Sequence, residues 1–220
     1  AQAQTMVKTA LGITSTVDLT SFDPVEAALS STPSIAADGI EIASHGVATQ
    51  NLVVQAAAVV KAAGDLDGWG SSTSSVYKAM ASYINDHLND HPGEEVLPDT
   101  NTYDQNIAIL KGLVVGAANA AANAPGLTFT EADLIEVQTA SDAVAAVMYE
   151  GLTQLQSAVD GSSGSVEALV EMAKAAVVAQ GSSAASITAA VDAVEADAAD
   201  TSLLSTLVSS YSGANLTAAL

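Results

Sequence analysis

Apolar side chains recur every three or four residues along most of this chain, which is the pattern of a buried helix face. The clearest run has four members at intervals of four residues: Val76, Met80, Ile84 and Leu88. No segment shows the sustained alternation of apolar and polar residues that is typical of a half-buried strand. We therefore predict an all-α protein, folded as an up-and-down bundle of about eight or nine helices.

The composition supports a packed bundle despite the acidity of the chain. Hydrophobic residues make up 49% of the sequence and charged residues only 14%, so burial of apolar surface can offset the entropy lost on ordering. The abundance of alanine allows close approach of helix axes. With 220 residues, a single helical domain over 1–220 is the first expectation, and a boundary within the polar segment 89–102 is the alternative.

Start and stop signals divide the chain into predicted helices. Gly12 ends an opening helix, Asp23 caps a short one that begins at Pro24, and Thr130 with Asp133 forms a box-like cap. Gly39 and Gly46 interrupt the helical pattern that runs from Ser34 to Ala63, and they indicate either close helix packing or a kink. The longer predicted helices are Ser34–Ala63, Thr73–Leu88, Tyr103–Ala124 and one from Thr130 to Val159, followed by three shorter segments, Ser165–Gln180, Ser183–Ala196 and Thr201–Tyr211.

The charge balance excludes several classes of partner. Five basic residues face 25 acidic ones, a net charge of -20, which disfavours binding to nucleic-acid phosphates and to anionic membrane surfaces. Cations, above all calcium, or basic proteins are the natural counterparts. Membrane insertion is not expected, because the long uncharged stretch 112–130 carries Asn119, Asn123 and Pro125. Without cysteine, disulfides and thiol catalysis are excluded.

The segment "GDLDGWG" at 64–70 carries two carboxylates, three glycines and the single tryptophan. Asp65 and Asp67 could chelate calcium, yet an EF-hand needs further oxygen ligands at alternating positions and a glutamate at the twelfth. Those later positions hold Trp69, Ser71 and Val76. We expect a turn between helices with Trp69 packed against the bundle, and keep an incomplete calcium site as the alternative.

The polar segment from Asp86 to Asp104 is the strongest candidate for a functional site. His87 and His91 are four residues apart, so a continuing helix places both imidazoles on one face, as zinc sites require. Pro92 and Gly93 follow at once, which favours a plain helix end instead. Six carboxylates surround the histidines as candidate calcium or zinc ligands: Asp86, Asp90, Glu94, Glu95, Asp99 and Asp104.

Catalysis has no support in the sequence. Nucleophile-elbow, phosphate-loop and dinucleotide motifs are absent, and Leu88 stands where a zinc protease needs a glutamate after its first histidine. Glu94 and Glu95 are the one carboxylate pair we would nominate for hydrolysis. His45 lies inside a helical run, where a partly buried polar group is expected more often than a ligand. We expect a protein that is not an enzyme.

The N-terminal third resembles segments of very large secreted bacterial surface proteins that also carry calcium-binding or cadherin-like repeats. The resemblance covers about the first sixty residues and rests on "VKTALGI", "VDLTSFDPVEAALS" and "TQNLVVQAAA". Its matching positions are Val7, Lys8, Ala10, Leu11, Gly12, Asp18, Leu19, Thr20, Phe22, Asp23, Pro24, Gln50 and Asn51.

This resemblance implies a non-catalytic structural or interaction module, located outside the cell or on its surface, whose partners are other protein domains or copies of itself. A start at Ala1 without a leader adds the expectation of a processed product or a piece of a longer protein. The alternative is a metal- or small-ligand-binding protein that uses the segment 86–104.

Overall fold

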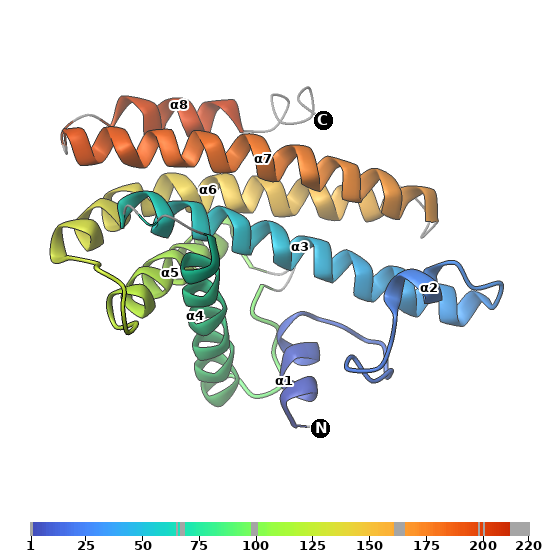
Figure 1. The fold of residues 1–220 in the computed structure, drawn as a ribbon. Helices are drawn as coiled ribbons and strands as arrows, with labels where there is room; N and C mark the ends of the chain where they lie inside the picture. Colours follow the sequence, from blue (N-terminus) through green and yellow to red (C-terminus); the bar gives the residue numbers. More distant parts are fainter. Residues whose placement is uncertain are drawn as a thin grey trace.

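A computed structural model describes residues 2–64, 66, 69–97, 101–160, 166–197, 199 and 201–211. Within these residues the chain forms helices, turns and loops without any strand, which confirms the all-α prediction (Figure 1). None of the described helices combines the length and apolar character needed to cross a membrane. The helices are α1 Gln2–Ala10, α2 Pro24–Ala28, α3 Pro33–Ala63, α4 Trp69–Asp90, α5 Tyr103–Ala122, α6 Glu131–Asp160, α7 Val166–Ala196 and α8 Ser202–Ser210.

Three long helices form the body of the bundle. In Figure 1, α3, α6 and α7 run side by side, with α8 lying along α6 and α7 at the top. Helices α4 and α5 pack against each other and against α3, and α4 descends steeply across the direction of the long helices. The short α1 and α2 lie near the N-terminal half of α3 and the lower end of α4. This arrangement leaves α3 in contact with more neighbours than any other described helix.

The second half of α3 is buried on every side. Val53, Val59 and Val60 have no exposed surface, and the three consecutive alanines Ala56–Ala58 have none either. Alanine has the shortest apolar side chain, so helices on all sides of α3 can approach its axis closely. The core therefore depends on small residues in α3 packed against longer ones from its neighbours, such as Leu110, Met148 and Ile187.

A polar residue pair fixes α7 against α3. The Gln55 amide donates a hydrogen bond of 3.1 Å to the Ser183 hydroxyl, and both side chains are buried. The prediction of separate helices Ser165–Gln180 and Ser183–Ala196 was wrong, because the helix continues through Gly181 and Ser182. Burial of Ser183 in the core holds this turn in helical register, which local serine and glycine preferences do not reveal.

Helix ends agree with most of the capping signals. Asp23 accepts hydrogen bonds from the backbone amides of Val25 and Glu26, and Thr130 and Asp133 exchange side-chain-to-backbone bonds as a capping box. Helix α4 starts at Trp69, four residues before the predicted Thr73, so "GDLDGWG" ends inside a helix. Its residues Asp65, Asp67 and Gly68, and the side chain of Trp69, lie outside the described residues.

The loop between α1 and α2 is held by hydrogen bonds to charged side chains. The Lys8 ammonium donates to the backbone carbonyls of Ser15, at 2.9 Å, and Val17. Asp18 accepts from Thr20 and from Gln4, and these hydrogen bonds lower its pKa to about 2. The Glu41 carboxylate on α3 accepts from Thr14 and from the amide of Ser15. The N-terminal segment is thereby attached to the first half of α3.

Gly39 allows α2 to cross α3 at close range. A Cβ at this position would lie 2.3 Å from the backbone nitrogen of Ala28, whereas a Cβ at Gly46 on the same helix would meet nothing within 4 Å. Of the two explanations for these glycines, close packing therefore applies to Gly39. Gly46 has no such steric reason.

We predict opposite effects for alanine at the two glycines. Gly39→Ala should destabilise the protein by about 1–3 kcal/mol, because backbone atoms of α2 must move. Gly46→Ala should stabilise it by about 0.5–1 kcal/mol through helix propensity alone. Urea unfolding of both variants measures the difference, and equal effects would disprove the close crossing.

Candidate functional site

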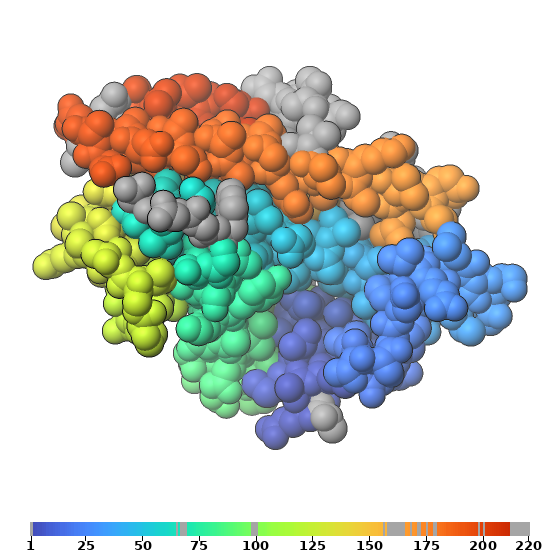
Figure 2. Space-filling view, viewed as in Figure 1, coloured from blue at the N-terminus to red at the C-terminus, as the bar shows by residue number. Residues whose placement is uncertain are grey.

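A cavity of about 660 Å³ lies between the middle of α3 and the helices below it. Its walls come from α1, α3, α4, α5 and α6 and from the polar segment that joins α4 to α5. In the space-filling view the N-terminal segment fills the angle between α4 and the α2 end of α3 (Figure 2). The cavity is therefore assembled from parts of the chain that are distant in sequence.

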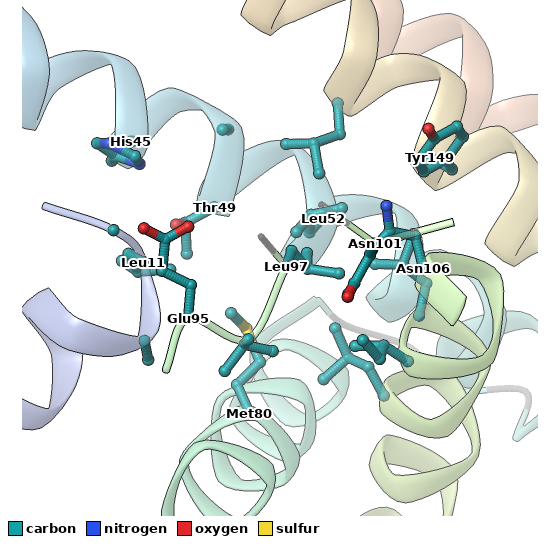
Figure 3. Close-up of a pocket in the computed structure, with 18 of the residues that line it drawn as sticks. Leu11, His45, Thr49, Leu52, Met80, Glu95, Leu97, Asn101, Asn106 and Tyr149 are labelled. Carbon is teal, nitrogen blue, oxygen red and sulfur yellow. The ribbon is translucent and has the colours of Figure 1, made fainter. Parts of the chain in front are cut away.

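The middle of the cavity is apolar. Leu52 from α3, Met80 from α4 and Leu97 from the connecting segment meet there (Figure 3). Leu110 and Leu113 of α5 add two buried side chains to this apolar lining. A surface of this kind binds apolar groups by removing them from water.

One end of the cavity carries His45 and Glu95. Figure 3 shows both side chains on the α1 side of the cavity, with Thr49 beside them. Burial lowers the pKa of His45 below its ordinary value of 6.5, although the nearby carboxylates of Glu41 and Glu95 act in the opposite direction. Burial thus favours the neutral imidazole, which can both donate and accept a hydrogen bond.

Glu95 lies directly against the backbone at Gly12. The carboxyl carbon of Glu95 is 2.7 Å from the point where a Cβ on Gly12 would stand. Gly12 has φ +68°, the left-handed region that favours glycine. The neighbouring Val96 amide donates to the Ala10 carbonyl at 2.9 Å, so the loop after α4 is attached to the end of α1 at the cavity.

The opposite end of the cavity carries neutral polar groups. The Asn101 amide donates to the Asn106 side-chain oxygen at 3.0 Å, and Tyr149 of α6 lies beside them (Figure 3). Tyr149 is held by an edge-to-face contact with Tyr103, with ring centroids 5.1 Å apart. A carboxylate and an imidazole therefore lie at one end of an apolar middle, and neutral amide and hydroxyl groups lie at the other.

The two histidines of the predicted pair do lie close together. His87 lies in the last turn of α4, His91 follows it, and their ring centroids are 5.2 Å apart. Glu94 approaches His91 with an N–O distance of 3.7 Å. The described residues nevertheless contain no group of three or more histidine, aspartate or glutamate side chains able to hold a metal ion.

The other predicted ligands are dispersed. Glu95 is an exposed side chain that lines the cavity, and Asp104 lies exposed in the first turn of α5. Asp65, Asp67 and Asp99 lie outside the described residues. Calcium or zinc binding by the predicted set stays a prediction. Within the described chain, the ring of His87 contacts that of His91, and His91 approaches Glu94.

Two residues of the cavity were already candidates in the sequence, although not as parts of a cavity. Glu95 was a candidate metal ligand, and His45 was weighed as a buried polar group or a ligand. Thr49, Asn106 and Tyr149 were missed, because each looks like an ordinary helix residue until three helices are placed around one space.

No protein-family model, curated protein sequence or solved structure matches this chain. The resemblance to surface proteins therefore stays a prediction.

We predict that acidification destabilises the protein through His45. As the pH falls below 6.5, the unfolded chain binds a proton at this histidine before the folded protein does, since burial lowers the folded pKa. Stability present above pH 6.5 is then lost progressively. Urea unfolding at pH 7.5 and 5.5 should show a larger loss for the wild type than for His45→Gln, and identical losses would refute a role for this residue.

Proposed function

We propose that this chain is a non-catalytic helical binding module of a secreted bacterial cell-surface or matrix protein, and that its cavity holds a small, largely apolar molecule. The cavity is the observation that carries the proposal. Protein interiors are close-packed, and voids larger than a water molecule are few. A space of about 660 Å³ falls instead within the range of about 300–1,000 Å³ that small-molecule sites occupy.

The walls of the cavity have the composition of a binding site. Small-molecule sites combine mostly apolar side chains with a few polar groups that set orientation, and here leucines separate His45 and Glu95 from Asn101 and Asn106. The walls are also fixed in place, by the Val96–Ala10 hydrogen bond and by the contact of Glu95 with Gly12. Such preorganisation reduces the entropy lost on binding.

The hydroxyl groups near His45 favour binding over catalysis. A nucleophilic serine needs a base within hydrogen-bond reach, whereas the Ser44 hydroxyl donates to the Glu41 backbone carbonyl at 2.7 Å. The Thr14 hydroxyl likewise donates to the Glu41 carboxylate, at 2.8 Å. These contacts support a site that holds a ligand without transforming it.

The cellular setting rests on the N-terminal resemblance and on charge. A net charge of -20 suits a module exposed to basic protein domains or to calcium, and repels nucleic acid and anionic lipid. Protease added to intact producing cells tests this setting, since a surface module is digested and an internal protein is spared.

We predict one saturable site for a neutral apolar dye. Nile red should bind with increased fluorescence and a stoichiometry of one, because the cavity excludes water from an uncharged apolar guest. Ala48→Phe, which places a ring in the cavity from α3, should abolish this binding. Ala37→Phe is the matched control, because Ala37 is exposed on the same helix and does not line the cavity.

The two variants distinguish dye binding inside the cavity from non-specific dye binding on the protein surface. Equal dye binding by wild type and Ala48→Phe, with Ala48→Phe folded by circular dichroism, would rule out the cavity as the site.

A further inference from the structure

The charges around the cavity mouth are not balanced. Glu41 and Glu95 both lie near His45, but the Glu41 carboxylate already accepts three hydrogen bonds, from Thr14 and Ser15. The Lys8 ammonium on α1 donates to two backbone carbonyls instead of a carboxylate. Within the described chain, the Glu95 carboxylate has neither an ion-pair partner nor a hydrogen-bond donor.

The chain supplies no cation to the cavity. Its five basic residues are Lys8, Lys61, Lys78, Lys111 and Lys174, and none of them lines the space. Lys111 pairs with Asp142 on the outer surface at 2.8 Å. The Glu95 side chain is exposed at the cavity mouth, so solvent screens its attraction for a cation, but no lysine competes for that cation there. An anionic guest would meet Glu95 and the strongly negative charge of the whole chain.

We propose that the cavity binds an amphipathic amine, with its protonated nitrogen at Glu95 and its apolar body between Leu52 and Leu97. This inference rests on the proposed function and adds the chemical class of the ligand. The ammonium group donates one hydrogen bond to the Glu95 carboxylate, and the His45 imidazole nitrogen accepts another. The apolar body then extends past Met80 toward Asn101 and Tyr149 (Figure 3).

The far end of the cavity accepts either a polar or an apolar tail of the ligand. Asn101 and Asn106 already bond to each other, but each amide retains further donor and acceptor capacity. A tail that ends in a hydroxyl or amide group is accommodated there, and a simple alkyl tail displaces water from the leucines. The discriminating contact is therefore the charged one at Glu95.

The test uses three probes with the same ten-carbon body: decylamine, decanol and decanoate, each below its aggregation concentration at neutral pH. Isothermal titration calorimetry should give the tightest binding for decylamine and the weakest for decanoate. Glu95→Gln should weaken decylamine binding by about fivefold, the loss of a charged hydrogen bond that is partly screened by solvent. Decanol binding should be unchanged in this variant.

Glu94→Gln is the matched control. It removes the same charge one residue away, at a side chain that is 68% exposed and faces His91 outside the cavity. Its decylamine affinity should equal that of the wild type. A fivefold loss in both variants would mean that only net charge matters, and would overturn the assignment of Glu95.

The remaining outcomes separate this inference from the proposed function. Binding of decanol and decanoate as tight as that of decylamine would leave an apolar site but refute an amine ligand. Failure of all three probes to bind, or undiminished binding to Ala48→Phe, would refute the cavity as a ligand site altogether.

Discussion

Close packing around the second half of α3 is the constraint on which the rest of the structure depends. The alanines at 56–58 and the valines beside them have no exposed surface, so α4, α5, α6 and α7 all pack against one short length of helix. The middle of α3 instead carries His45, Ala48 and Thr49, which line the cavity. The cavity opens where α4 and α5 diverge from the long helices, and the packing of small side chains no longer fills the space between them.

The N-terminal segment completes the wall that the long helices leave open. Lys8 and Glu41 hold the α1–α2 loop by hydrogen bonds to its backbone, and Gly12 leaves room for the Glu95 carboxylate. Several residues that carry the resemblance to surface proteins, including Lys8, Gly12, Asp18 and Asp23, thus have structural roles in this fold. The same contacts place a carboxylate and an imidazole together at the cavity mouth, so the architecture and the proposed ligand chemistry share one set of residues.

The all-helical class followed from apolar periodicity, and caps such as Thr130 with Asp133 followed from local sequence, because both depend on residues within a few positions of one another. The continuity of α7 did not, since it depends on Ser183 meeting Gln55 from a distant helix. The cavity was hidden for the same reason. Glu95 and His45 could be named as polar residues of interest, but their approach depends on α1, α3 and the segment after α4 coming together. Tyr149 and Asn106 gave no sequence signal at all.

The central claim is that the space between α3, α4 and α5 is a ligand site and not a packing gap. A crystal structure of the protein grown with decylamine tests it most directly. We predict continuous density for an alkyl chain between Leu52 and Leu97, with its nitrogen within hydrogen-bond distance of the Glu95 carboxylate. Decylamine found only on the outer surface, or a cavity closed by movement of Met80 and the leucines, would contradict a ligand-binding role.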